Sequence, residues 1–269
     1  MDFTGIIAEY DPFHNGHAAQ LAAVRAAGAQ CIAVCMSSGA VQRGGVPILP
    51  ESVRVRAALD AGADLVVALP APYACATAEQ FAAAGVHLLA ALGCDTLAFG
   101  AETPDAAALL DTARLLDGEE LNARIRQNLA TGMTYAAARA AAADALHPGT
   151  GDLLRTPNNI LGIEYCKAIL HQHAALTPLA LPRLGAAHGG GAGAHAGTPM
   201  ASASFLRGLP QPDWEPFVPA RAAELYGKAA ADGLLLDGAK LETAVLALMR
   251  MQDPANFAQV RGVSEGLEN

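Results

Sequence analysis

The stretch EYDPFHNGHAAQL, residues 9–21, joins a short apolar segment to a helical pattern. It places two histidines, His14 and His17, three residues apart with Gly16 between them. Pro12 disfavours a helical conformation at the residue before it, so we expect the strand to end there and a helix to begin soon afterwards. The two histidines are therefore predicted to lie at the first turn between a strand and a helix.

Short apolar segments alternate with helical ones through the first hundred residues. Strands are predicted over residues 4–9, 31–36, 64–70 and 96–100, and helices over residues 16–28, 50–62 and 77–93. Strands without polar alternation, separated by helices, are typical of a parallel sheet that is covered on both faces. The predicted fold class is α/β: a doubly wound, Rossmann-like parallel sheet followed by helical segments.

The second half of the chain reads mainly as helix. Helices are predicted over residues 105–146, 156–170 and 200–209 and twice after residue 219, with a strand over 176–184 and a flexible glycine-rich loop over 185–199. We expect two domains, residues 1–210 and residues 211–269, the second being the start of a helical region that continues beyond this chain.

Composition bounds the possible functions. The chain has 269 residues, of which 52% are hydrophobic and 16% charged, and its net charge is −9. Without an apolar stretch of about 18 residues or a basic N-terminal segment, neither a membrane span nor a signal peptide is expected, which favours the cytoplasm. The acidic balance argues against a broad basic face for nucleic acid, although a local arginine patch stays possible. The five cysteines are expected to be buried thiols rather than disulfides or metal ligands.

The histidine turn suits a phosphate ligand. In an open parallel sheet, ligands bind beyond the carboxyl ends of the strands, where this turn lies. A helix that begins near Asn15 offers free N–H groups and a positive dipole end, and Gly16 lets a ligand approach the backbone. His14 and His17 could donate hydrogen bonds to phosphate oxygens and stabilise the charge that develops when a phosphoryl centre is attacked.

The H-x-G-H pattern of this turn is that of the nucleotidylyltransferase superfamily. Together with residues 36–47, 62–70, 97–102, 157–168 and 262–269, in this order, it resembles the bacterial tRNA(Met) cytidine acetate ligase family. The resemblance implies a fold of the nucleotidylyltransferase type and an ATP-dependent, adenylate-forming ligase. Such an enzyme activates acetate as acetyl-adenylate and transfers the acetyl group to the wobble cytidine of elongator tRNA(Met), with Mg²⁺ accompanying ATP.

The resemblance also implies site residues. His14 and His17 are the implied catalytic residues, and the chain itself is expected to hold no metal. The implied ATP-binding residues are Ile7, Ala8, Glu9, Tyr10, Asp11, Pro12, Phe13, His14, Asn15, Gly16, His17, Ala18, Ala19, Gln20, Gly100, Asn158, Asn159, Arg183, Leu184, Ser202, Ser204 and Arg207. One of Asn158 and Asn159 is expected to contact ATP, and the sequence does not decide which.

The chain departs from the family's pattern in length, because members continue past the element at residues 262–269. We expect a further helical, basic region to carry much of the tRNA contact. Arg54 and Arg56 flank Val55 on a predicted helix, so at most one of them can face the site. Glu102 is expected to be an exposed strand-end carboxylate, with a water-mediated Mg²⁺ contact as the alternative.

Two other functions stay open. A small-molecule adenylyltransferase or a pantothenate synthetase-like ligase would share the sheet and the histidine motif, and would act without tRNA. A non-catalytic module that binds nucleotide or tRNA would bind ATP without releasing pyrophosphate.

Overall fold

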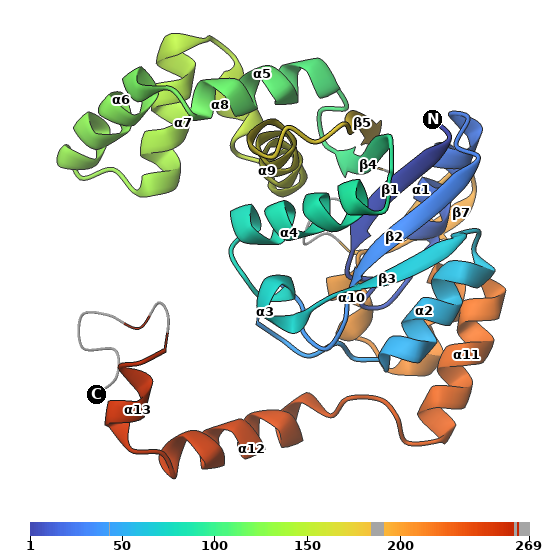
Figure 1. Ribbon diagram of the computed structural model, residues 1–269. Helices are drawn as coiled ribbons and strands as arrows, with labels where there is room; N and C mark the ends of the chain where they lie inside the picture. The colour runs from blue at the N-terminus through green and yellow to red at the C-terminus, as the bar shows by residue number, and fades with distance from the viewer. Residues whose placement is uncertain (43, 184–190, 261–262, 264–269) are drawn as a thin grey trace. The chain divides into compact units, whose positions relative to one another are not determined.

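The computed structural model describes residues 1–42, 44–183, 191–260 and 263 of the chain (Figure 1). It divides into two compact units, Met1–Leu234 and Leu235–Asn269.

The first unit is built on a five-stranded, fully parallel sheet. Its strands are β1 (Phe3–Ala8), β2 (Cys31–Ser37), β3 (Leu65–Leu69), β4 (Thr96–Ala101) and β5 (Thr177–Pro182). Their order is β3-β2-β1-β4-β5, so the chain moves outward from β1 and then returns to its other side. The predicted α/β fold with a doubly wound parallel sheet is confirmed.

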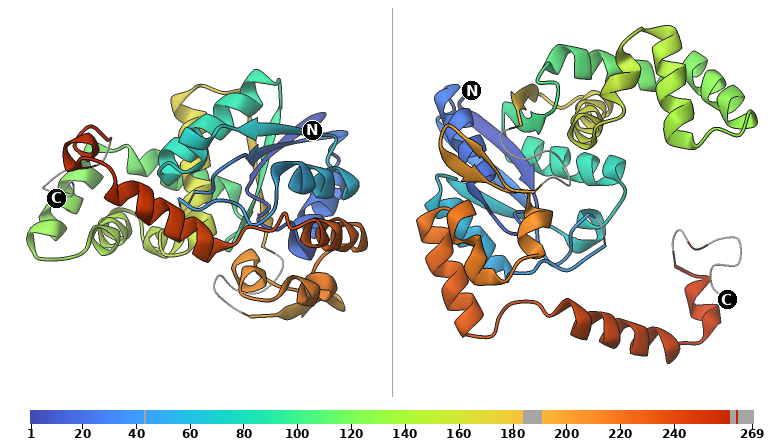
Figure 2. Two further views of the ribbon diagram at one scale, coloured as in Figure 1. Left: turned by 90° about the horizontal axis from the view of Figure 1, so that it is seen from below. Right: turned by 180° about the vertical axis from the view of Figure 1, so that it is seen from behind.

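Helices cover both faces of this sheet (Figures 1 and 2). They are α1 (Asn15–Ala26), α2 (Glu51–Asp60), α3 (Ala71–Ala74), α4 (Ala78–Ala91) and α9 (Pro157–His171). Glycine allows α4 to approach β1 closely: a Cβ at Gly5 would lie 2.6 Å from Leu89, and one at Gly85 would lie 2.5 Å from Ile7. The apolar core between sheet and helix is therefore tight.

A helical segment separates β4 from β5, as the sequence predicts. It contains α5 (Ala106–Leu116), α6 (Glu119–Ala130), α7 (Tyr135–Leu146) and α8 (Thr150–Leu153). Asp105 and Thr134 cap α5 and α7 with their side-chain oxygens, which supplies partners for free amides at each N-terminus. Buried apolar side chains join these helices to the main core.

Residues 185–190 of the predicted glycine-rich loop lie outside the described residues. The described part, residues 191–199, is ordered, contrary to the expected flexible loop. Within residues 191–200, β6 (Gly193–His195) and β7 (Thr198–Met200) form an antiparallel hairpin. Its turn uses positive φ at Ala196 (47°) and Gly197 (81°), a conformation that glycine adopts without strain. The helix predicted over residues 200–209 is present as α10 (Ala203–Arg207).

The first unit continues to Leu234, beyond the boundary expected at residue 210. The 3-10 helix η1 (Gln211–Phe217) buries Trp214, and α11 (Ala220–Ala231) buries Tyr226 and packs against α2 (Figure 2). These side chains complete the core of the first unit, so residues 211–234 belong structurally to the sheet domain.

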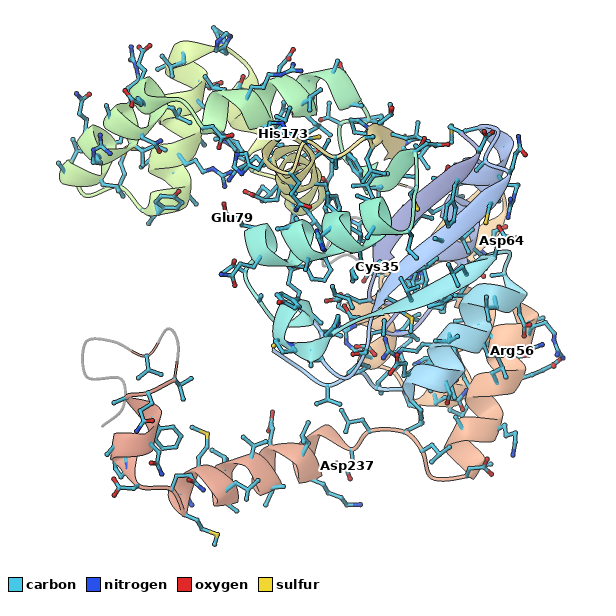
Figure 3. All side chains as sticks on the ribbon, in the orientation of Figure 1. Cys35, Arg56, Asp64, Glu79, His173 and Asp237 are labelled. Carbon is cyan, nitrogen blue, oxygen red and sulfur yellow. The ribbon has the colours of Figure 1, made fainter. Side chains whose placement is uncertain are left out.

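The second unit contains α12 (Gly238–Arg250) and the short α13 (Pro254–Phe257). Among the described helices, none is both long enough and apolar enough to cross a membrane. The cysteines are all free thiols. Cys35 lies inside the sheet on β2 (Figure 3), and Cys94 and Cys166 are buried, whereas Cys75 is exposed, contrary to expectation.

Candidate functional site

The carboxyl edge of the sheet opens between β1 and β4. Within the described chain, the ladder between these strands holds two pairs, Thr4 with Thr96 and Gly5 with Leu97. The carboxyl halves of β1 and β4 are therefore not paired with each other. This is the point where the strand order reverses, which is where ligands bind in doubly wound sheets.

The two histidines of the first turn are held by the backbone around them. The Gly16 amide donates to Nδ1 of His14 (3.1 Å), and the His14 amide donates to Nδ1 of His17 (3.3 Å). Together these bonds form a capping box at the start of α1. The two rings are stacked, with centroids 3.7 Å apart and planes 21° apart.

This arrangement determines the tautomer of both rings. A nitrogen that accepts a backbone N–H has a free lone pair, so the proton of a neutral imidazole must be on the other nitrogen. Nε2 of His14 and Nε2 of His17 are therefore N–H donors. Neither Nε2 has a hydrogen-bond partner among the residues that the structure describes, so both donors are available to a ligand.

The environment keeps both imidazoles neutral. Burial, with a smaller contribution from the Arg183 guanidinium, lowers the pKa of His14 to about 3. Burial also lowers the pKa of His17 well below its ordinary value, with smaller contributions from His14 and Arg183. At neutral pH the pair therefore offers two neutral hydrogen-bond donors, and the positive charge comes from Arg183.

Aromatic rings pack around the histidine turn. The Tyr10 ring lies 4.8 Å from those of Phe13 and His17, and the Phe13 ring lies 5.6 Å from that of His17. Tyr10 has a positive φ of 50°, which is unusual for a bulky residue, and its side chain is buried. The hydroxyl of Tyr226, on α11, donates to the Phe13 carbonyl (2.9 Å).

Arg207 lies against the same turn through Asp11. Its guanidinium donates to the Asp11 carbonyl and lies 3.5 Å from the Asp11 carboxylate, which also accepts the Ile48 amide (2.7 Å). Burial, partly offset by Ile48, Arg207 and Arg54, raises the pKa of Asp11. The structure thus brings Arg207 to the histidine turn and engages it with a carboxylate there.

Two other polar residues, Asn15 and Ser202, hold these segments in place. The Asn15 side chain donates to the carbonyls of Pro199 (2.9 Å) and Pro216 (3.2 Å). The Ser202 hydroxyl caps α10 by accepting the Phe205 amide (3.2 Å) and lies 3.1 Å from the Ser204 hydroxyl. Asn15 therefore ties the turn to β7 and η1, and Ser202 orders the start of α10.

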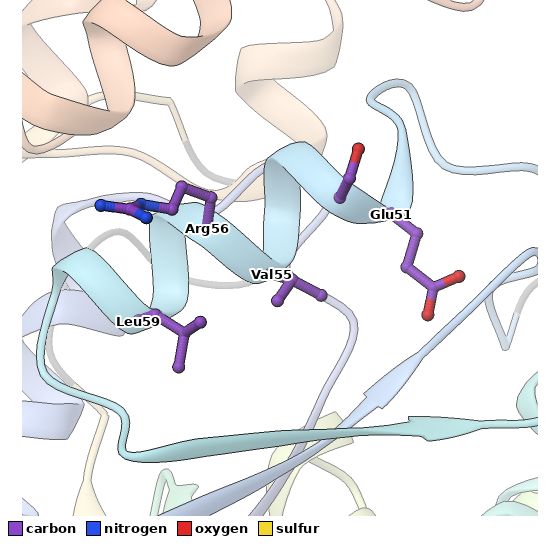
Figure 4. Close-up of a pocket in the computed structure, with 5 residues that line it drawn as sticks. Glu51, Val55, Arg56 and Leu59 are labelled. Carbon is purple, nitrogen blue, oxygen red and sulfur yellow. The ribbon is translucent and has the colours of Figure 1, made fainter.

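A buried arginine joins the strand ends on the other side of the turn. Arg54, on α2, is 1% exposed and donates to the carbonyls of Glu9 (2.8 Å), Ser37 (2.8 Å) and Ser38 and of Leu49 (3.2 Å). Arg56 instead pairs with Asp60 on the surface. It borders a shallow pocket of 630 Å³ with Glu51, Val55 and Leu59, to which no predicted site residue contributes (Figure 4).

A third group of site residues meets at the ends of β4 and β5. Gly100 is near the end of β4, and a Cβ built there meets nothing within 4 Å, so the space beside it is open. Arg183 follows β5 and donates its amide to the Ala101 carbonyl (3.1 Å). Its guanidinium lies 4.0 Å from the Glu102 carboxylate. Leu184, the neighbour of Arg183, lies outside the described residues.

Glu102 is an exposed carboxylate at the end of β4, as the sequence predicts, and the start of α9 holds it in place. It accepts the Asn158 side-chain amide (2.7 Å) and the Asn159 backbone amide (2.9 Å) at the start of α9. Burial would raise the pKa of Glu102, but the hydrogen bonds from Asn158 and Asn159 outweigh it and lower that pKa. Asn159 is 1% exposed and bonds to Thr103 through both ends of its amide, whereas Asn158 stays partly exposed at the edge.

Sequence reasoning did not select three residues that hold this edge together. The sequence leaves open whether Arg54 or Arg56 faces the site, and it predicts only exposure or a water-mediated Mg²⁺ contact for Glu102. The partners of Arg54 and Glu102 are backbone groups or residues distant in sequence, which spacing does not reveal. Tyr226 has no sequence signal, since its hydroxyl donates to a carbonyl 213 residues earlier. Among the described residues, no group of three or more His, Cys, Asp and Glu side chains could hold a metal ion.

The parallel sheet and the histidine turn at its point of reversal define the class as nucleotidyl transferases with an H-x-G-H motif. The chain belongs to the HIGH Nucleotidyl Transferase family, which it matches over residues 1–269. The predicted family resemblance is confirmed by curated relatives. The chain is 40% identical over 252 residues to a tRNA(Met) cytidine acetate ligase of Syntrophotalea carbinolica (92% of this chain, 60% of that protein). It is 39% identical over 189 residues to the Bacillus subtilis protein of the same name (68% and 45%).

Solved structures show the same fold. Thermotoga maritima TmcAL, in a crystal structure bound with alpha-thio ATP, matches with a TM-score of 0.86 at 26% identity. The apo crystal structure of the same protein matches with a TM-score of 0.88 at 27% identity. Both alignments cover 100% of this chain and 66% of the other. The chain therefore spans less than two thirds of the length of these relatives.

Proposed function

We propose that this chain binds ATP and activates acetate as acetyl-adenylate, and that the acetyl group then passes to the wobble cytidine of elongator tRNA(Met). One observation carries the proposal: two stacked histidines, whose Nε2–H groups have no partner among the described residues, lie where the sheet order reverses, and the charge of Arg183 acts on the pKa of both. The name shared by the curated relatives and the ATP analogue bound to T. maritima TmcAL support it.

The proposed reaction needs hydrogen-bond donors to the phosphate oxygens and no covalent intermediate with the enzyme. A carboxylate oxygen of acetate attacks the α-phosphorus of ATP, the bond to the leaving phosphate breaks, and pyrophosphate departs. Charge grows on the phosphate oxygens during this step, and donors fixed in advance stabilise it. His14 and His17 supply two such donors, and Arg183 supplies a positive charge. The cytidine amine then attacks the acetyl carbonyl, and AMP leaves.

Other predicted residues take roles consistent with their positions. Asn158 is the better candidate for a contact with ATP, because Asn159 is buried and its amide is occupied by Thr103. The open space beside Gly100 suits the approach of the nucleotide. Ser202, Ser204 and Arg207 would hold the outer phosphates, and this requires Arg207 to exchange its contact with Asp11 for phosphate. Leu184 remains part of the proposed site by its place next to Arg183.

Magnesium fits this site as a companion of ATP. The Asp11 carboxylate already accepts the Ile48 amide and faces Arg207, and the Glu102 carboxylate is held by α9. In this proposal the triphosphate oxygens therefore hold the ion, which would neutralise part of their charge. The histidines act on the α-phosphate as donors whether or not they touch the ion.

The tRNA step would have to overcome the acidity of this chain, whose net charge is −9. Binding of nucleic acid depends on contacts between cations and phosphates, and its affinity falls steeply with salt. We place this reaction in the cytoplasm, where tRNA is modified, and expect the local arginines of the nucleotide edge to supply only a small part of the contact with tRNA phosphates.

ATP–pyrophosphate exchange tests the proposal. Exchange should occur with acetate, occur less with propionate and formate, and be lost in a His14→Asn, His17→Asn double variant but kept in His173→Asn, an exposed histidine (Figure 3). Transfer of labelled acetyl to tRNA(Met) tests the second step. Exchange that depends on pantoate would support the small-molecule ligase instead, and ATP binding without exchange would support a non-catalytic module.

A further inference from the structure

Glu102 ends the segment 97–102 that carries the family resemblance, yet the resemblance implies no ATP-binding role for it. It directly follows β4, while Arg183 directly follows β5, and these neighbouring strands pair from Thr96 with Thr177 to Ala101 with Pro182. The start of α9, at Pro157, lies against the same edge. One carboxylate thus stands between two elements that each carry a proposed ATP-binding residue.

The contacts of this carboxylate are divided between its two oxygens. Oε2 accepts the Asn159 backbone amide (2.9 Å), and Oε1 accepts the Asn158 side-chain amide (2.7 Å). The same Oε1 lies 4.0 Å from the Arg183 guanidinium. Helix N-termini attract negative charge, so α9 fixes the carboxylate in place and keeps it ionised.

Arg183 gains its orientation from this arrangement. Its side chain is 25% exposed, and Glu102 is its only side-chain partner among the described residues. An arginine without a partner samples many rotamers, and ordering it on binding a ligand would cost free energy. A fixed carboxylate reduces this cost by holding the guanidinium near the two histidines before ATP arrives.

We infer that Glu102 is a positioning residue of the nucleotide site, which orients the Arg183 guanidinium and the Asn158 amide toward ATP. This inference rests on the proposed ATP-binding function. Simple electrostatics predicts the opposite effect on ATP affinity. A carboxylate near a triphosphate repels the triphosphate, so removal of the Glu102 charge alone should strengthen ATP binding.

Positioning and charge repulsion predict opposite changes in ATP affinity when Glu102 loses its charge, and calorimetric titration with ATP measures that change. Glu102→Gln removes the charge with little change of shape, and we expect it to bind ATP about tenfold more weakly, within the coupling range of side chains in contact. Glu119→Gln removes a charge from the first turn of α6, outside the site, and should leave ATP affinity unchanged. ATP binding by Glu102→Gln that equals or exceeds that of the unsubstituted chain would overturn the inference.

A double-mutant cycle separates positioning from a merely structural role. In an Arg183→Ala background, Glu102→Gln should weaken ATP binding by a smaller factor than in the unsubstituted chain, because one of the two groups it positions is gone. The same factor in both backgrounds would mean that Glu102 acts only by capping α9, and would overturn the inference. If the Gln variant does not fold, Glu102→Asp, which keeps the charge but loses reach, replaces it with the same expectations. Failure of the unsubstituted chain to bind ATP would overturn the proposed function as well.

Discussion

The Tyr226 hydroxyl donates a 2.9 Å hydrogen bond to the carbonyl oxygen of Phe13, the residue before His14. Both side chains are fully buried, and the Trp214 ring packs edge-on against Tyr226 with centroids 5.9 Å apart. Helix α11 therefore braces the histidine turn from outside the segment that the motif defines. The geometry of the first turn depends on residues beyond position 210.

Removal of this brace should be measurable in Tyr226→Phe. The substitution leaves the buried Phe13 carbonyl without its donor, and an unsatisfied buried acceptor costs about 1–3 kcal/mol. We expect the free energy of unfolding in urea to fall by that amount. Tyr135→Phe, at a residue that is 62% exposed, is the matched control and should be neutral. Equal stability of the two variants would show that the Phe13 carbonyl finds another partner.

The two nitrogens of His14 should have separable roles. Asparagine can replace Nδ1 as the acceptor at the start of α1, and it is a preferred residue at that position, but it cannot place a donor where Nε2 lies. The free energy of unfolding of His14→Asn should therefore lie within about 1 kcal/mol of that of the unsubstituted chain. Its rate of ATP–pyrophosphate exchange should fall about a hundredfold.

The control for this substitution is His173→Asn, because His173 is exposed and has a positive φ of 48°, which asparagine tolerates. It should retain full exchange activity. Retained exchange in His14→Asn would contradict the assignment of Nε2 as a donor to phosphate.

The lowered pKa values of His14 and His17 predict a loss of stability in mild acid. As the pH falls below 6.5, the unfolded chain takes up protons on these histidines, whereas the folded chain takes one up on His14 only near pH 3. The unfolded state then binds more protons than the folded state, so the free energy of unfolding decreases as the pH decreases.

Urea unfolding at pH 7 and pH 5 measures this effect, because most carboxylates titrate below that range. The His14→Asn, His17→Asn double variant should lose less stability between these two pH values than the unsubstituted chain. The same loss in both proteins would mean that the two imidazoles titrate alike in the folded and unfolded states.

The fold and the place of the site follow from local patterns in the sequence. Apolar strands, helix starts and the turn at residues 9–21 are local features, and the parallel sheet places their carboxyl ends on one edge. The contacts that fix the site are not local. Glu102 meets Asn158 across 56 residues, and Arg54 meets the Glu9 carbonyl across 45. Nothing in the spacing of such residues reveals which backbone groups they will reach.

The hairpin of β6 and β7 shows a different reason why a prediction from sequence can fail. Its sequence is rich in glycine, which favours a flexible loop by composition. Within the described part of this segment, however, Met200 is buried and the Asn15 side chain bonds to the Pro199 carbonyl. Tertiary contacts with the start of α1 thus order a segment whose own propensity is weak.

Arg54 and Arg56 provide the last comparison, since they lie two residues apart on α2 and differ in almost every contact. Arg54 is 1% exposed and its guanidinium donates to four backbone carbonyls at the ends of β1 and β2 and before α2. Burial lowers the pKa of Arg54, with the Asp11 carboxylate as the largest opposing influence. Arg56 is exposed and pairs with Asp60 one turn away.

Arg54→Ala should therefore reduce the free energy of unfolding by about 3–5 kcal/mol, because it leaves several buried carbonyls without donors and Asp11 with one cation fewer. Arg54→Lys should recover only part of this loss, since an ammonium group cannot reproduce the planar set of guanidinium donors. Arg56→Ala should leave urea unfolding unchanged, because exposed ion pairs on helices contribute little. If Arg54→Ala were as stable as Arg56→Ala, water or a neighbouring side chain would have to satisfy the carbonyls of Glu9, Ser37 and Ser38, and the strand ends that flank the histidine turn would not depend on Arg54.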